Sequence, residues 1–391
     1  MRASAVPHRR LLVLVALLYV AEGLPYGIVN ELVPVWLKVQ GLSLQDLGLL
    51  QLVGLPWVLK PLWAPWVDRY GTTARWVAGA LGGAAVVTAI LPWLGGPPLA
   101  AALVLLAILS ATQDVAIDGF TATEVGPEQL GRANGVRVAA YRFAMLLAGG
   151  GAVALADRVP WSVLFLVLAS AMAGLAIVAT RIPTAARSET TTASWIAELR
   201  AWVLAPGAVV LFTFTVLFKL GDAAMTPMLK PFWIDAGLTL AEVGLVSITL
   251  ATIATVAGAL LGGEIATRIG IGRSLWILGG LQAISNLVYA GAALEPSRPA
   301  VYAASLVEAF CGGLGTAAFL ALLMRACEQR QAATRFAVLT AISGLARTIA
   351  GAISGYGAGA LGYAGWFAVS FALAIPGLLL VPSLVRRIDK R

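Results

Sequence analysis

Long apolar stretches follow one another along nearly the whole chain, and only short polar connections separate them. A stretch of about 20 apolar residues is long enough to cross the hydrocarbon core of a bilayer as a helix. Inside lipid the backbone polar groups must pair within the segment, which favours helices over open sheets. Only 12% of the residues are charged, whereas soluble domains carry about 25%. The chain is therefore predicted to be an all-α membrane protein.

At this helix length, 391 residues accommodate about twelve transmembrane helices with short loops between them. The predicted spans are 11–37, 44–67, 73–94, 98–122, 135–156, 160–180, 207–231, 240–266, 273–294, 299–325, 334–358 and 362–385. Segment 181–206 is polar at first and ends in Trp195-Ile-Ala-Glu-Leu-Arg-Ala-Trp202, which is typical of a cytoplasmic linker with a short interfacial helix. The predicted domains are a six-helix bundle at 1–180, the linker at 181–206 and a second six-helix bundle at 207–391.

Lysine and arginine are distributed unevenly over the loops. When residues within three positions of a span end are counted with the adjacent loop, the tails and even-numbered loops hold 19 of the 27, the odd-numbered loops hold four, and the span interiors hold the remaining four. Positive residues gather on the cytoplasmic side, so both termini are predicted to be cytoplasmic, in a bacterial-type inner membrane. The same bias explains the net charge of +8 without a nucleic-acid partner, because no basic face of the kind that binds nucleic acid is visible.

Histidine and cysteine are too scarce for most metal and catalytic chemistry. His8 is the single histidine of the chain, and Cys311 and Cys327 are its two cysteines. The usual metal sites and histidine-based catalysis are therefore not expected, and neither is a disulfide framework. We expect no catalytic residues, no metal and no cofactor. A membrane enzyme is accordingly disfavoured.

The two halves of the chain resemble each other at an offset near 200 residues. Gly41-Leu-Ser-Leu-Gln-Asp-Leu-Gly48 matches Gly237-Leu-Thr-Leu-Ala-Glu-Val-Gly244. Both segments contain a predicted capping box, Ser43 with Asp46 and Thr239 with Glu242. Asp68-Arg69-Tyr70-Gly71 likewise aligns with Thr267-Arg268-Ile269-Gly270, and Arg132 with Arg335. Two pseudo-symmetric six-helix bundles with a solute site near the bilayer midplane are typical of a secondary transporter.

Ionisable side chains lie inside the predicted spans, where each costs about 2.5–3.5 kcal/mol on insertion scales and marks a functional site by default. The acids lie on the first helix of each three-helix unit and are predicted to couple proton movement: Glu22, Asp114, Asp118, Asp222 and Glu308. Asp114 and Asp118 are four residues apart and share a helix face. Two neighbouring carboxylates disfavour ionisation of both, which suits proton uptake and release.

Structural roles are open alternatives for these acids. Asp114 and Asp118 could instead be partners of Lys60, Arg137 or Arg142, and Glu22 could bond to a neighbouring helix. Lys219 and Asp222 are three residues apart and could neutralise each other.

Polar and aromatic residues of the spans are predicted to line the solute path: Tyr26, Asn30, Gln113, Tyr141, Arg142, Lys219, Gln282, Asn286 and Arg347. Glu22 precedes Gly23-Leu-Pro25, a predicted helix break that would free backbone carbonyls toward a cavity. Gln282 and Asn286 could alternatively join helices by hydrogen bonds.

Several of these motifs resemble those of the AmpG-type permeases of the major facilitator superfamily. The resembling segments are Gly54-Leu-Pro-Trp-Val-Leu-Lys60-Pro-Leu-Trp63-Ala-Pro65-Trp-Val-Asp68-Arg69-Tyr70, Thr112-Gln113-Asp114-Val-Ala-Ile-Asp118, Tyr141-Arg142-Phe-Ala-Met-Leu146, Lys219-Leu-Gly-Asp222 and Cys311-Gly-Gly-Leu-Gly-Thr316. The resemblance implies the major facilitator fold and proton-driven import of anhydro-muropeptides. It also implies a gating role for Asp68 and Arg69, to which we add Lys60 of the same span; a simple helix-capping turn is the alternative.

The leading hypothesis is a proton-coupled symporter that acts as a monomer in the lipid bilayer and imports a muropeptide-like or other polar, partly anionic small solute. Related branches of the family import siderophores or carry acetyl-CoA, and the opening Glu22-Gly-Leu-Pro-Tyr26 looks closer to the siderophore branch. An exporter of the same superfamily is a further alternative. The glycine-rich run Ala148-Gly-Gly-Gly151 is present, but it does not follow the expected antiporter spacing.

Overall fold

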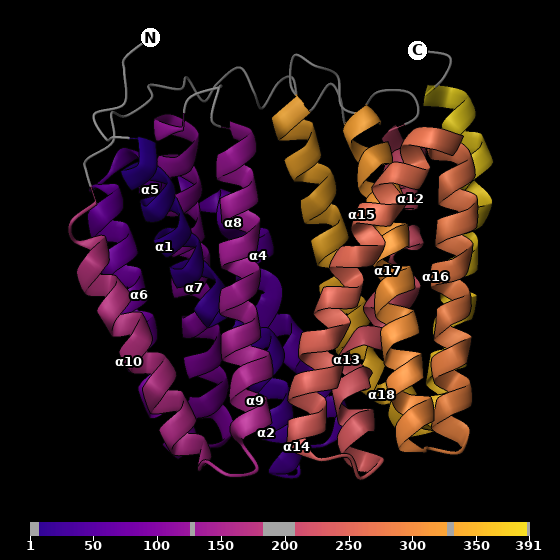
Figure 1. Ribbon diagram of the computed structural model, residues 1–391, viewed down its shortest axis with the longest axis horizontal. Coiled ribbons are helices and arrows are strands. Elements are labelled where there is room, and N and C mark those ends of the chain that lie inside the picture. Colours follow the sequence, from indigo (N-terminus) through magenta and orange to yellow (C-terminus); the bar gives the residue numbers. More distant parts are fainter. Residues whose placement is uncertain (1–7, 126–129, 183–207, 327–331, 389–391) are drawn as a thin grey trace. The chain divides into compact units, whose positions relative to one another are not determined.

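A computed structural model describes residues 8–125, 130–182, 208–326 and 332–388, and every regular element in these ranges is a helix. The chain forms two compact units (Figure 1). Unit 1 comprises Met1–Trp36 and Val53–Glu189, and unit 2 comprises Leu37–Leu52 and Thr190–Arg391. A short segment from the first half of the sequence therefore belongs to unit 2. The predicted boundaries at 180 and 207 remain a prediction, as does the linker, most of which lies outside the described residues.

The helices of unit 1 are coloured indigo to magenta in Figure 1. They are α1 (His8–Gly27), η1 (Ile28–Leu32), α2 (Val33–Val39, which continues into unit 2), η2 (Leu50–Gly54, which begins in unit 2), α4 (Leu55–Leu59), η3 (Lys60–Leu62), α5 (Ala64–Arg69), α6 (Thr73–Ile90), η4 (Leu91–Trp93), α7 (Gly96–Glu124), α8 (Leu130–Met145), η6 (Leu146–Gly151), α9 (Ala152–Leu155) and α10 (Trp161–Ala179). Of these, η1 and η6 are π-helical segments inside longer helices.

Unit 2 contains the remaining helices. They are α3 (Leu44–Leu49), α12 (Ala208–Phe218), α13 (Leu220–Asp235), α14 (Leu240–Glu242), η7 (Val243–Leu250), α15 (Ala251–Ile269), α16 (Ile271–Leu294), α17 (Arg298–Ala326) and α18 (Ala332–Ile388).

Ten helices among the described residues are long and apolar enough to cross a membrane, against twelve predicted. The difference arises in two places. The predicted span 44–67 is divided into short helices, because Pro56, Pro61 and Pro65 lie at the starts of α4, η3 and α5 and remove backbone donors there. The last two predicted spans are two helices joined by a kink at Gly362 (φ 69°, ψ 170°), and because the label α18 covers both they are counted once.

The sequence repeat is visible in the turns. Gly41 and Gly237 have φ values of 88° and 77°, and Gly71 and Gly270 have 75° and 84°. These left-handed conformations favour glycine, so the matched glycines end matching helices in the same way. The predicted capping box is complete at Thr239 and Glu242. At Ser43 only half of it forms, because the Asp46 carboxylate accepts from the Ser43 hydroxyl rather than from its backbone.

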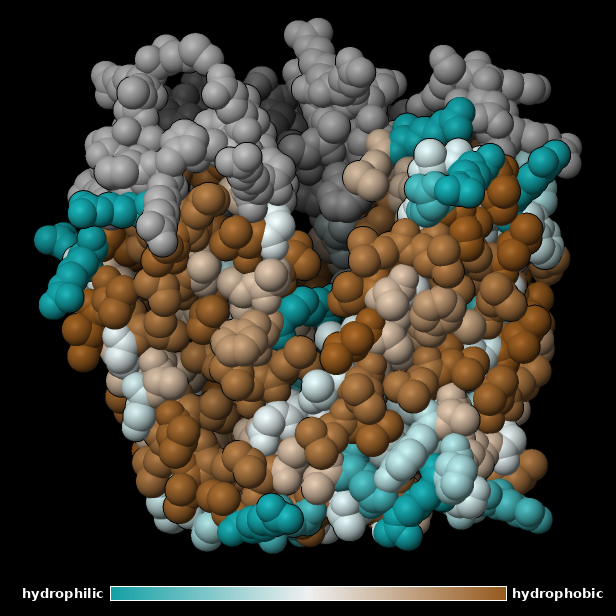
Figure 2. All heavy atoms as spheres, viewed as in Figure 1, coloured by the Kyte–Doolittle hydropathy of each residue, from teal (hydrophilic) through white to brown (hydrophobic). Residues whose placement is uncertain are grey.

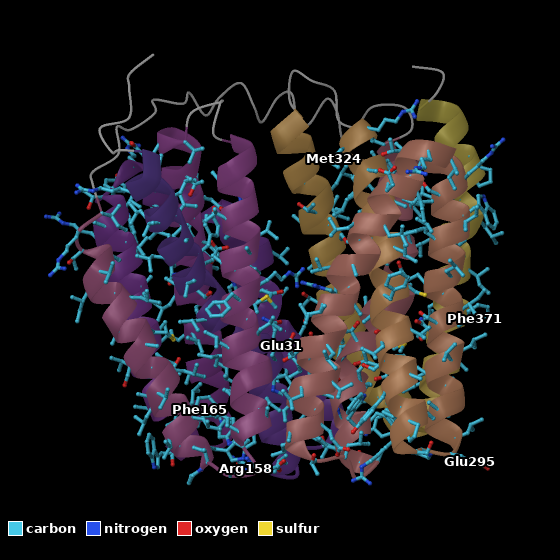
Figure 3. The ribbon with its side chains drawn as sticks, viewed as in Figure 1. Glu31, Arg158, Phe165, Glu295, Met324 and Phe371 are labelled. Atoms are coloured by element: carbon cyan, nitrogen blue, oxygen red, sulfur yellow. The ribbon has the colours of Figure 1, made fainter. Side chains whose placement is uncertain are left out.

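Hydrophobic side chains cover the middle of the visible face of each unit, and hydrophilic ones gather at the helix ends (Figure 2). Large apolar residues such as Val209, Leu260 and Ile277 are more than half exposed. Such a surface suits lipid rather than water. In Figure 3 the charged Arg158 and Glu295 each lie at a helix end of their own unit, whereas Phe165 is fully buried in unit 1.

The predicted helix break after Glu22 is wrong. Helix α1 continues through Pro25 to Gly27, and the π-helical η1 follows. Packing explains why the helix persists: a Cβ on Gly23 would lie 2.6 Å from the Tyr141 carbonyl oxygen and 2.8 Å from the Ala144 Cβ, so α1 lies directly against α8. This contact holds the segment helical despite the missing donor of Pro25.

Candidate functional site

Unit 1 contains a cluster of charged side chains from four elements. We define cluster 1 as Glu22 on α1, Lys60 on η3, Asp114 and Asp118 on α7, and Arg137 on α8. Helix α7 presents its two aspartates one turn apart, and the close packing of α1 on α8 brings Glu22 and Arg137 toward them.

Asp118 is the best-paired acid of cluster 1. Its Oδ1 lies 3.2 Å from an Arg137 guanidinium nitrogen and accepts a 2.8 Å hydrogen bond from the Tyr19 hydroxyl. The same guanidinium lies over the Tyr19 ring, 4.8 Å from its centroid. The Lys60 Nζ is shared, at 3.8 Å from Asp118 Oδ2 and 3.7 Å from Asp114 Oδ2. Lys60 and Arg137 are thus the partners that the structure selects for Asp118.

Glu22 and Asp114 are paired much less well. They are 8% and 6% exposed, and within the described residues Glu22 Oε2 and Asp114 Oδ1 accept no hydrogen bond. Cluster 1 holds three acids against two cations, so one acid has no counter-charge inside it. An isolated buried charge is far more costly than a neutral acid, so one bound proton relieves the imbalance.

Polar and aromatic side chains of α1, α4, α7 and α8 lie on the elements that carry these acids or contact them. Gln113 is fully buried, and in the described part of the chain neither of its amide atoms has a hydrogen-bond partner. The same holds for the indole nitrogen of Trp57. The Tyr26 ring lies 5.1 Å from that of Trp57 and 5.7 Å from that of Tyr141. Trp57 is not among the site residues predicted from the sequence, although its place three residues before Lys60 was a usable signal.

Unit 2 contains a second cluster, centred on Lys219. We define cluster 2 as Lys219, Asp222, Gln282, Thr316 and Glu308. Lys219 lies at the break between α12 and α13, and its Nζ donates to Asp222 Oδ2 at 3.1 Å, Gln282 Oε1 at 3.0 Å and Thr316 Oγ1 at 2.8 Å. The Gln282 amide also donates to Asp222 Oδ2. All three ammonium hydrogens are therefore used within cluster 2.

Glu308 lies on α17, the helix that also carries Thr316. It interacts electrostatically with Asp222 and Lys219. No hydrogen bond or ion pair joins it to another described residue. Lys219 is already paired with Asp222, so Glu308 is the acid in excess in cluster 2.

The other predicted site residues are dispersed. The Asn30 amide donates to the Tyr26 carbonyl on its own helix, and the Asn286 amide joins α16 to α18 through Ser370 Oγ at 3.0 Å. Arg142 and Arg347 are exposed. Of the predicted gating residues, Lys60 lies in cluster 1, Arg69 is exposed beside Tyr70, and the side chain of Asp68 lies outside the described residues. No group of three or more potential ligands could hold a metal ion among the described residues.

Unit 2 also contains a contact that the sequence analysis missed. Helix α3 docks on α18, where a Cβ on Gly48 would lie 2.8 Å from the Gly355 nitrogen. Beside it, Lys38 Nζ lies 2.7 Å from Asp235 Oδ2, which also accepts a 2.6 Å hydrogen bond from the Tyr363 hydroxyl. The signal was the four-residue spacing of Gly351, Gly355 and Gly359, which permits close helix packing. We call these interactions the α3 docking contact.

Comparison with known proteins agrees with this architecture. A family model described as Major Facilitator Superfamily matches residues 15–220. The anhydromuropeptide permease of Escherichia coli (strain K12) is 33% identical over 377 residues, which cover 92% of this chain and 77% of the permease. The putative transporter AmpG 4 of Rickettsia conorii is 26% identical over 397 residues, covering 95% and 96% of the two chains.

Solved structures share the fold at low sequence identity. The crystal structure of a bacterial homolog to the human lysosomal transporter Spinster has a TM-score of 0.81 at 15% identity and covers 99% of this chain and 98% of its own. A D-xylose-proton symporter has a TM-score of 0.73 at 12% identity, with coverages of 95% and 96%. Family and fold are those of transporters and not of enzymes. The chain therefore belongs to the major facilitator superfamily, as a multi-pass secondary transporter of the AmpG-type permease family.

Proposed function

We propose that the protein is a proton-coupled symporter that imports a muropeptide-like or other polar, partly anionic solute. It works as a monomer in a bacterial inner membrane with both termini in the cytoplasm. The name of the E. coli relative supports the solute class, and the loop charges support the orientation. The observation that carries the proposal is cluster 1, where Glu22 and Asp114 share too few counter-charges.

Proton coupling requires that a proton bind two conformations of the transporter with different affinities. Cluster 1 meets this requirement because its ion pairs join different elements. Lys60 on η3 and Arg137 on α8 neutralise acids on α7. A movement of these elements changes the charge balance around Glu22 and Asp114, and therefore changes the affinity for a proton.

To bind the anionic part of the solute, a cation must have N–H groups that are not already bonded within cluster 1 or cluster 2. Lys219 is a poor candidate, because its three hydrogens already bind cluster 2 residues. Arg142 is exposed although it lies inside a candidate membrane span. A guanidinium at such a position suits a polar path, and it can bind a carboxylate through two parallel hydrogen bonds. We assign this role to Arg142.

The proposal is tested with right-side-out membrane vesicles and a labelled anhydromuropeptide. When the outside is more acidic than the inside, the wild type should accumulate the anhydromuropeptide. Asp114→Asn should abolish this accumulation while the protein still purifies as a folded monomer. Glu264→Gln is the matched control, since Glu264 is an exposed acid paired with Arg268 on its own helix. Normal proton-driven accumulation in Asp114→Asn would contradict the proposal, and proton-driven efflux would favour an exporter.

A further inference from the structure

The two clusters share an imbalance of charge. Cluster 1 contains the acids Glu22, Asp114 and Asp118 with the cations Lys60 and Arg137. Cluster 2 contains the acids Asp222 and Glu308 with the cation Lys219. Among the described residues, each cluster therefore has one acid more than it has cations.

Among the described residues of unit 1, charged and titratable side chains from four elements interact with the Glu22–Asp114 pair. Helix α1 adds Tyr19, η3 adds Lys60, α7 adds Asp118, and α8 adds Arg137 and Tyr141. Arg137 and the Tyr19 hydroxyl are engaged with Asp118, which leaves Lys60 as the cation that reaches Asp114. Nothing in this set supplies a second positive charge for Glu22.

In unit 2, Glu308 likewise has no cation of its own among the described residues. Its charged neighbours are Asp222 and Lys219 from the α12–α13 break, and its titratable neighbours are Tyr289 on α16 and Cys311 on its own helix. Lys219 is saturated by Asp222, Gln282 and Thr316. A carboxylate at this place would face Asp222 without a cation of its own.

The acids of the two clusters also lie at comparable positions of the sequence repeat. Asp114 on α7 and Glu308 on α17 are separated by 194 positions, and Glu22 and Asp222 by 200 positions, both close to the repeat offset near 200. The two clusters thus occupy equivalent helices of the two halves. A carboxylic acid lies at both places, while the cations around it differ.

We propose that the protein has two separate proton sites, the Glu22–Asp114 pair in unit 1 and Glu308 in unit 2, so that two protons accompany each solute. The proposal rests on the proposed proton coupling. It adds the location of the second site and the number of protons. Because each cluster is balanced by its own proton, neither site depends on the counter-charges of the other.

Infrared difference spectroscopy tests the two sites without any solute. The purified protein is titrated in lipid, and the carbonyl stretch of protonated carboxyl groups is followed. In the wild type, two carboxyl signals should disappear as the pH rises, one from Glu308 and one from the Glu22–Asp114 pair. Glu308→Gln should remove the first signal and leave the second. Glu22→Gln should alter the second signal and leave the first. The control Glu264→Gln should leave both unchanged.

A single signal in the wild type, or a spectrum that Glu308→Gln does not change, would overturn the proposal. If Glu308→Gln does not yield folded protein, the wild type still decides the matter by proton counting. In proteoliposomes, the protons taken up are measured with a pH indicator for each labelled anhydromuropeptide transported. Two protons support the proposal and one overturns it. If the anhydromuropeptide is not transported, the proposed cargo fails, and the infrared signals still decide the number of proton sites.

Discussion

A single added methyl group on α3 should release the α3 docking contact. In Gly48→Ala, the new Cβ would lie 2.8 Å from the Gly355 nitrogen and 2.9 Å from the Ala352 carbonyl oxygen. Ordinary contact begins at 3.4 Å, so α3 must withdraw by about 0.6 Å from backbone atoms that cannot rotate away. Overpacking of this kind costs about 1–3 kcal/mol, and replacing a helical glycine by alanine returns about 0.5–1 kcal/mol. The docked state should lose on the order of 1 kcal/mol, which raises the undocked population about 5-fold.

Cysteine labelling measures this population directly. In a chain whose two native cysteines are replaced by serine, Leu47→Cys reports undocking, because Leu47 is 2% exposed in the docked state. Gly48→Ala should speed its reaction with a water-soluble maleimide about 5-fold. Leu49→Cys, at a position that is 38% exposed, provides the reference rate. Gly79→Ala is the matched control, because a Cβ there meets nothing within 4 Å. An unchanged Leu47→Cys rate in Gly48→Ala would refute the reasoning.

Three further substitutions address the charged residues. Asp235→Asn should raise Leu47→Cys labelling by less than Gly48→Ala does, because Asp235 is 41% exposed and such pairs contribute about 0.2–1 kcal/mol. Lys219→Ala should lower the thermal stability of the purified protein more than the double change Lys219→Ala/Asp222→Ala does. The single change leaves the Asp222 carboxylate without its cation, at a cost of up to about 3–5 kcal/mol. Equal losses of stability in the two variants would contradict the pairing. Arg142→Gln should raise KM for an anionic anhydromuropeptide about tenfold or more, as expected for the loss of a charged hydrogen bond, and leave KM for an uncharged analogue unchanged.

The helical spans and the internal repeat could be predicted from the sequence, because apolar length and matched segments reveal them directly. The apolar stretches predicted the helical membrane architecture, and the matched segments predicted equivalent turns, which Gly41 and Gly237 display in their backbone angles. Hydropathy could not reveal how the second predicted span divides, since each short helix is as apolar as a continuous one. The π-helical segments were equally hidden, because their hydrogen-bond pattern changes no residue type.

The choice of partners for the buried acids could be only partly predicted. Three cations were available to Asp114 and Asp118, and the structure selects Lys60 and Arg137. Helix geometry explains why Arg142 is not among them: it lies five residues beyond Arg137 and hence about 140° away around α8. The partners Gln282 and Thr316 lie 63 and 97 residues from Lys219, so no local signal could have found them.

The distance in sequence between partners has a mechanical consequence for the two clusters. Lys219 and Asp222 are three residues apart across one helix start, so movement between helices leaves their pairing intact. The pairs of cluster 1 join η3, α7 and α8, and relative movement of these elements alters them. On the two-site proposal, proton binding at Glu22 or Asp114 would depend on ion pairs that helix movement breaks and re-forms. Proton binding at Glu308 would depend on how closely α17 approaches the Lys219–Asp222 pair, which stays intact. The two proposed sites would then release protons at different points of the conformational cycle, and one solute would be coupled to both.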